Sequence, residues 1–512
     1  MNRMAVMLLA GMILLFSLPC VPDRASGAAP ASAPLSEATQ ACIDCHQDLH
    51  PGLVADWRAG RHAKTAPGTA LERAEGERRI SAASVPPALR SVAVGCYECH
   101  SLNGSAHKDN FDHAGYRINI VVSPRDCETC HPTEVKEYSG SKKAHALANL
   151  ESNPVFMCLV EAVDALKGSK GGKEAPIKAS EATKDETCYA CHGTQVEVTG
   201  RKTVSTDAGE MEFPELRNWP NQGVGRVNPD GSLGACTSCH PRHRFAIGVA
   251  RRPYTCGQCH LEPDVPAFDV YHESKHGNIF SSSGGEWNFD NVPWVAGRDF
   301  FAPTCAVCHG SLLATTNGTP VAARTHDFGS RPWVRIFGLI YSHPQPKSGM
   351  TFLIRNKDGL PLPTAFSGEP AAPFLIDKDE QAARLDRMKG ICRSCHTSGF
   401  TDGHFTKFAA SVAEADRMVL AATLLLQGAW DAGLADKSNP FDEGIELKWV
   451  REWLFYANSV RFGSAMMGPD YATFKHGWWD LTDNIAEMTD LIRLKQDKGI
   501  NCPCPSSPPT PR

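Results

Sequence analysis

The sequence has no surplus of positive charge, and it has no long apolar run after its first eighteen residues. Its 52 Lys and Arg face 57 Asp and Glu, a formal net charge of −5. Proteins that bind nucleic acid through charge need a clear basic excess, so we expect no nucleic-acid partner. Hydrophobic residues make up only 42% of the chain, beside 43 Gly and 36 Pro. This composition favours short loops and turns over a conventional apolar interior.

Cysteine, in contrast, is abundant and arranged in a pattern. Sixteen of the 20 cysteines belong to eight copies of Cys-x-x-Cys-His. Random placement would give about 0.03 copies. The copies are Cys42, Cys45 and His46; Cys96, Cys99 and His100; Cys127, Cys130 and His131; Cys188, Cys191 and His192; Cys236, Cys239 and His240; Cys256, Cys259 and His260; Cys305, Cys308 and His309; Cys392, Cys395 and His396.

Each copy suits the covalent attachment of a c-type haem. Two thiols three residues apart add to the vinyl groups of one porphyrin, and the next histidine binds the iron from one side. Zinc sites and redox disulfides also use Cys-x-x-Cys pairs, but a histidine directly after every pair favours haem. We therefore predict eight c-type haems, which would themselves form much of the interior.

The first 27 residues are typical of a secretory signal peptide. Arg3 supplies the positive start, Met4 to Leu18 the apolar run, and Ala25-Ser26-Gly27 a cleavage site. This predicts export to the periplasm, where c-type haems are attached. Two alternatives stay open: the run is retained as a membrane anchor, or Leu18-Pro19-Cys20 is a lipidation site.

The last hundred residues differ from the rest. Seven apolar residues recur at alternating steps of four and three, which predicts a long amphipathic helix: Phe408, Val412, Ala415, Val419, Ala422, Leu426 and Ala429. A second helix carries Trp449, Trp453, Tyr456 and Val460, and a third runs from about Ala472 to Lys495.

We therefore predict a mainly α fold, with a loop-rich haem-packed N-terminal region and a C-terminal bundle of long helices. The predicted organisation is a signal peptide over 1–27, an octahaem domain over 28–400, a helical domain over 401–498 and a disordered tail over 499–512.

Twelve histidines lie outside the motifs and supply candidates for the second axial ligand. Eight bis-histidine haems need eight of them, and seven suffice if one iron keeps an open position for chemistry. The sequence contexts favour seven: His62, His113, His145, His243, His276, His326 and His476. His62 and His145 each follow an aromatic residue, Trp57 or Tyr138, and we expect both on helices.

Several stretches resemble the octahaem hydroxylamine oxidoreductase family. They are Asn218–Ser232 leading into Cys236–His243, Tyr271–Gly277, Trp294–Cys308 and Gly468–Tyr471. The resemblance runs from about Cys42 to Leu494. It implies a homotrimer in which the haem of Cys188, Cys191 and His192 is five-coordinate and catalytic, while the other haems relay electrons.

The resemblance also implies two further catalytic residues. Tyr471 matches the tyrosine that oxidising members bond covalently to the catalytic haem of a neighbouring subunit, and Asp264 matches the family's distal aspartate. Oxidising members have a histidine directly after that aspartate, whereas this chain has Val265. Without the resemblance, Asp264 is also explained as a turn cap and Tyr471 as a buried aromatic. His272, His343 and Tyr341 are other groups that could enter the pocket.

We accordingly predict an enzyme that oxidises hydroxylamine, or hydrazine, to nitric oxide or nitrite. Its electrons would pass to a cytochrome c or to a quinone-linked acceptor in the membrane. Two alternatives stay open: reduction of nitrite or hydroxylamine to ammonia on the same haems, and a conduit whose irons are all six-coordinate.

Overall fold

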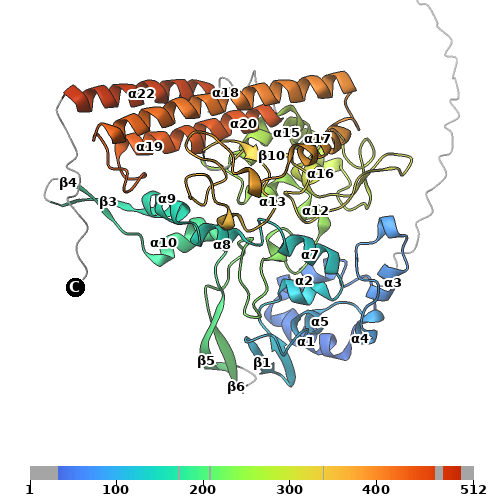
Figure 1. The fold of residues 1–512 in the computed structure, drawn as a ribbon. Helices are drawn as coiled ribbons and strands as arrows, with labels where there is room; N and C mark the ends of the chain where they lie inside the picture. Colours follow the sequence, from blue (N-terminus) through green and yellow to red (C-terminus); the bar gives the residue numbers. More distant parts are fainter. Residues whose placement is uncertain (1–32, 171–172, 207–208, 338–339, 467–476, 498–512) are drawn as a thin grey trace, which may run out of the picture.

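The computed structural model describes residues 33–170, 173–206, 209–337, 340–466 and 477–497. Tyr471, His476, the predicted signal peptide and the predicted tail lie outside the described residues. The fold is mainly α, as predicted, and its strands are short or form hairpins (Figure 1).

Short helices separated by loops dominate the region that carries the Cys-x-x-Cys-His motifs. Proline occupies the first turn of many of them, where its fixed φ favours helix and its missing N–H costs nothing. The helices are α1 (Glu37–Leu49), α2 (Pro51–Ala59), α3 (Pro67–Leu71), α4 (Pro87–Arg90), α5 (Cys96–His100), α6 (Pro124–Glu128), α7 (Pro132–Ser139), α8 (Ala146–Glu151), α9 (Pro154–Asp164), α10 (Glu181–Glu186), α11 (Cys188–His192), α12 (Ile247–Ala250), α13 (Pro253–Gly257), α14 (Ala267–Glu273), α15 (Lys275–Ser283), α16 (Cys305–His309) and α17 (Lys378–Cys392).

The strands pair mostly with their neighbours in sequence. Antiparallel pairs join β1 (Asn110–His113) with β2 (Tyr116–Asn119), β3 (Leu166–Lys170) with β4 (Lys173–Ile177), β5 (Glu197–Thr206) with β6 (Gly209–Arg217), and β10 (Val334–Arg335) with β11 (His343–Pro344). In the remaining sheet β8 (Leu313–Ala314) lies between β7 (Trp294–Val295) and β9 (Pro320–Ala322). The hairpin β5–β6 projects away from the body of the molecule (Figure 1).

Long helices cover one end of the molecule (Figure 1). The longest, α18 (Ser398–Asp431), starts directly after the last motif and contacts α20 (Ala457–Met466) and α22 (Trp478–Asp497). All seven apolar residues of the predicted 4-3 pattern are buried in α18, so that prediction is confirmed.

The second predicted helix is continuous but changes its winding. It begins as α19 (Gly444–Val450), passes through a π-helical stretch, η6 (Arg451–Tyr456), and continues as α20. The third predicted helix is observed as α22, and the proposed start near Ala472 lies outside the described residues. The core of these helices also takes in Ile340, Tyr341 and residues of α9. The proposed domain boundary near residue 400 stays a prediction.

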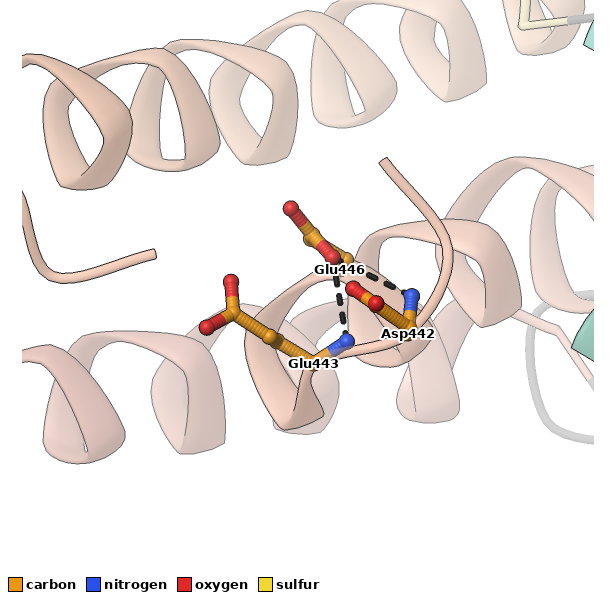
Figure 2. A group of neighbouring side chains, drawn as sticks. All are labelled: Asp442, Glu443 and Glu446. Carbon is orange, nitrogen blue, oxygen red and sulfur yellow. Dashed lines mark hydrogen bonds between the residues drawn. The ribbon is translucent and has the colours of Figure 1, made fainter. Parts of the chain in front are cut away.

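The side chain of Glu446 caps the start of α19 and is drawn with Asp442 and Glu443 in Figure 2. Glu446 accepts hydrogen bonds from the backbone N–H groups of Asp442 and Glu443, and from the Trp430 indole. These bonds satisfy N–H groups that the first turn of a helix leaves without partners. Burial raises the pKa of Glu446 to about 7, against the opposing effect of these donors.

The two histidines expected on helices lie in turns instead. Helix α2 ends at Ala59 and α7 at Ser139, so His62 and His145 both follow a helix end. Gly60, directly after α2, has an extended backbone, and Gly140 directly follows the last residue of α7. Within the described residues, no helix is long and apolar enough to cross a membrane.

Candidate haem sites and catalytic pocket

A continuous cavity of about 3000 Å³ runs through the motif-bearing region. Cysteines of the second to eighth motifs line it, together with the motif histidines from the third onward. The apolar core is divided into separate clusters, the largest of which lies among the C-terminal long helices. Low apolar content and a cavity lined by haem-attachment residues fit the prediction that porphyrins fill the interior.

Three motif histidines are oriented by backbone carbonyls. The Nδ1 atoms of His100, His192 and His309 lie 2.7, 3.2 and 3.1 Å from carbonyl oxygens of other segments. A histidine that donates from Nδ1 presents Nε2 to a metal, and this second contact fixes the ring plane. Burial lowers the pKa of all three imidazoles, which favours the neutral form that binds iron.

Three of the predicted distal histidines face motif histidines at the separation that an iron requires. Imidazole nitrogens bind metal ions at about 2 Å, so two rings on opposite sides of one metal have centroids roughly 6 Å apart. The observed centroid distances are 6.1 Å for His46 and His113, 6.4 Å for His62 and His131, and 6.1 Å for His276 and His396. These residues therefore fit bis-histidine haems.

Two further predicted ligands lie close to motif histidines. Burial and then the charge of His100 lower the pKa of His243 to about 4. Burial and then the charge of His326 lower the pKa of His240 to about 3. His145 differs, since its ring contacts the backbone of Ser139.

Contacts between thiols of different motifs give the spatial order of the sites, which the sequence does not reveal. Side chains touch in four pairs: Cys42 with Cys96, Cys127 with Cys236, Cys191 with Cys259, and Cys256 with Cys305. Charge effects also link Cys99 with Cys130, Cys239 with Cys256, and Cys308 with Cys392. The sixth motif is thus next to the fourth, fifth and seventh, and the first motif lies at one end.

The structure brings Asp264 to the fourth motif, as the resemblance implied. Asp264 lines the cavity, and its charge acts on Cys188, Cys191 and His192. Burial raises the pKa of Asp264, against the opposing effects of backbone N–H groups and His192. A carboxyl group at this position can take part in proton transfer with a bound molecule.

Residues that the sequence did not single out hold this pocket. Asn458, buried on α20, donates a hydrogen bond of 3.0 Å to the backbone oxygen of Asp264. Phe156 and Leu159 of α9 and Leu454 of η6 line the cavity. Helix α20 therefore helps to position the loop that carries Asp264.

The alternative pocket groups lie elsewhere, whereas Val265 lines the cavity beside Asp264. His272 is exposed. Tyr341 is buried among the C-terminal helices and donates to the Phe366 carbonyl at 2.8 Å. His343 is buried, with Nδ1 on the Pro344 carbonyl and no hydrogen-bond partner for Nε2 among the described residues.

Comparison with known proteins agrees with this architecture. Residues 230–318 match the family model described as seven times multi-haem cytochrome CxxCH, and residues 126–212 match cytochrome c554 and c-prime. A solved structure of a hypothetical multiheme protein superposes with a TM-score of 0.85 and 41% identity, covering 91% of this chain and 97% of that one. The chain therefore belongs to the multihaem cytochromes c and carries c-type haems.

Within that class, the chain is similar to hydroxylamine oxidoreductase-like (HAO-like) proteins. The reducing HAO-like protein complex of Kuenenia stuttgartiensis shares the fold, with a TM-score of 0.60 and 17% identity over 91% of this chain and 86% of that one. A probable nitrite reductase-hydroxylamine oxidoreductase fusion protein of the same organism is 27% identical over 284 residues, 52% of this chain. The chain spans only 25% of that relative's length. This chain is therefore a multihaem cytochrome c that is similar to HAO-like proteins.

Proposed function

We propose that the protein is an octahaem oxidoreductase that oxidises hydroxylamine, or the related hydrazine, at the haem held by Cys188, Cys191 and His192. The observation that carries the proposal is Asp264, a cavity-lining carboxyl group whose charge reaches all three residues of that motif. A c-type haem held by these residues would supply an iron that can bind a small nitrogen compound and accept its electrons.

The roles of the protein residues follow from their positions. His192 holds the iron from one side and is oriented by the Ala146 carbonyl at 3.2 Å. Asp264 accepts protons from the N–H and O–H groups of the substrate, since loss of three electrons from hydroxylamine also releases three protons. Val265 beside it is apolar and holds neither a proton nor a water molecule. Formation of nitrite requires the addition of a water molecule and the removal of a fourth electron and two more protons, so we propose that nitric oxide is released preferentially.

The remaining haems form the electron relay in this proposal. His62, His113 and His276 would supply second ligands, as their ring separations from motif histidines support. His243 and His326, which lie close to motif histidines, would supply two more, with His145 and His476 as further candidates. The chain would act in the periplasm as a homotrimer and pass electrons to a cytochrome c or a quinone-linked acceptor. Tyr471 of one subunit would be bonded to the catalytic haem of its neighbour.

The reverse reaction, reduction of nitrite or hydroxylamine to ammonia, is the second candidate. The position of Asp264 also supports it, because a cavity-lining carboxyl group beside the fourth motif can pass on the protons that reduction consumes. Peptide mass spectrometry separates the candidates, since the oxidative one requires a haem peptide linked to the peptide of Tyr471.

Substitution of Asp264 tests the catalytic role. We expect Asp264→Asn to lower kcat for hydroxylamine oxidation about 100-fold or more, the usual contribution of a general base, with haem content and absorption spectrum unchanged. Glu262→Gln, on the same loop, is the matched control and should keep its activity. Anoxic turnover should release nitric oxide, and an undiminished rate in Asp264→Asn or nitrite as the sole product would contradict the proposal.

A further inference from the structure

Lys143 lies opposite the histidine of the sixth motif. It belongs to the turn that follows α7 and lines the large cavity. Its Nζ atom is 3.4 Å from Nε2 of His260. Two donor atoms bound to one metal from opposite sides stand about 4 Å apart, because each bond to nitrogen is about 2 Å long. The Lys143 amine is thus close to the place of a second axial ligand.

A repeat in the sequence supports the same placement. Trp57 and Tyr138 are both buried and lie in the last turn of their helices, Trp57 two residues before the end of α2 and Tyr138 one residue before the end of α7. The residue five positions after Trp57 is His62, whose ring faces His131 across 6.4 Å. The residue five positions after Tyr138 is Lys143. The two helix-turn units therefore present a nitrogen donor at equivalent positions.

The nearest alternative donor points elsewhere. His145 follows in the same turn, but its ring contacts the backbone of Ser139. In the described part of the chain, the aromatic ring contact of His260 is with Phe337, at 6.4 Å, and not with another imidazole. Lys143 is therefore the donor that faces His260.

We propose that Lys143 is the second axial ligand of the haem attached at Cys256 and Cys259, so that this iron is held by one imidazole and one amine. An amine binds a metal through the lone pair of its nitrogen. The site adjoins the fourth motif, because the thiols of Cys191 and Cys259 are in contact. The first relay haem after the catalytic one would then differ in ligation from the bis-histidine haems.

Electron paramagnetic resonance and near-infrared magnetic circular dichroism of the ferric holoprotein test the assignment without any turnover. Both methods distinguish imidazole-amine from bis-imidazole ligation. We expect one imidazole-amine haem in the wild type. Lys143→His should move that one signal into the bis-imidazole class, and Lys143→Met should abolish it. Lys142→Met, at the neighbouring lysine of the same turn, should leave it unchanged.

The opposite results overturn the assignment. One is a wild-type spectrum without an imidazole-amine signal. Another is a spectrum that Lys143→His leaves unchanged. This second variant keeps the assignment testable if Lys143→Met fails to take up its haem. Loss of one bis-imidazole signal in His145→Met but no change in Lys143→Met would assign the ligand to His145. The high-spin signal expected of the His192 haem is counted separately, so failure of the proposed function leaves this test intact.

Discussion

His107 is held between two carboxylates in the interior. Its Nδ1 and Nε2 atoms each lie 3.1 Å from a carboxylate oxygen, of Asp109 and Asp126 respectively. Burial alone would lower the pKa of His107, but the hydrogen bonds and charges of Asp109 and Asp126 outweigh it and raise the pKa to about 10. His107 therefore acts as a buried cation that joins the loop before β1 to the segment carrying the third motif.

The contacts of His107 with Asp109 and Asp126 should make the free energy of unfolding depend on pH in the alkaline range. The unfolded pKa of histidine is about 6.5, so the stabilisation is complete below that pH and is lost as pH rises through about 10. His107→Gln should abolish this dependence and cost about 3 kcal/mol at neutral pH, since two buried carboxylates lose their cation. Denaturant unfolding between pH 6 and 10 measures both effects. His272→Gln, at an exposed histidine, should keep the wild-type slope.

At the scale of secondary-structure elements, a buried ionisable group also makes stability depend on pH, in the π-helical stretch η6. Glu452 is fully buried there and accepts a hydrogen bond of 2.7 Å from Asn484 of α22 through one oxygen. Among the described residues, its other oxygen has no partner. Burial raises the pKa of Glu452 to about 8, against the smaller effect of Asn484. The folded protein thus keeps this side chain protonated where the unfolded chain is ionised.

The consequence is a loss of stability as pH rises from about 4.5 to 8. Glu452→Gln keeps the shape and the contact with Asn484 but cannot ionise. We expect this variant to gain on the order of 2 kcal/mol or more over the wild type at pH 8, since each pKa unit is worth about 1.4 kcal/mol. Thermal unfolding at pH 5 and pH 8 measures the difference. An equal gain at both pH values, or one shared by the exposed control Glu414→Gln, would contradict this explanation.

Local patterns explain which elements were predictable. The 4-3 spacing of α18 identifies its buried face because helical periodicity depends only on neighbouring residues. The prediction of helices at His62 and His145 is wrong. The apolar and aromatic spacing around Trp57 and Tyr138 is helical, but α2 and α7 end before these histidines are reached. The π-helical winding of η6 was not predicted, since no local signal distinguishes it from an α-helix.

The candidate site was predictable only where resemblance or local motif supplied it. The motif cysteines and histidines follow from spacing, and Asp264 followed from the resemblance. Pairs such as His100 with His243 join segments far apart in sequence. They could not be predicted, because periodicity depends only on neighbouring residues. A search for histidine ligands does not find Lys143. The signal that could have identified it is its spacing from Tyr138, which repeats that of His62 from Trp57.

At the scale of the whole molecule, the order of thiol contacts makes the sixth motif a junction. It joins the fourth motif, where we place catalysis, to both the fifth and the seventh. The first motif contacts the second and does not line the cavity. Loss of the sixth haem should therefore remove the neighbour to which the proposed catalytic haem passes electrons. Loss of the first haem should remove only a terminal member of the relay.

Removal of single haems tests this arrangement. In stopped-flow absorption, hydroxylamine added to the Cys42→Ala/Cys45→Ala variant should reduce the remaining relay haems at close to the wild-type rate. In the Cys256→Ala/Cys259→Ala variant, electrons should reach the catalytic haem but pass on at least tenfold more slowly, because the neighbouring electron acceptor is gone. Haem content and limited proteolysis establish that each variant is folded before rates are compared. Relay reduction at the wild-type rate without the sixth haem would show that electrons leave the fourth motif by another route.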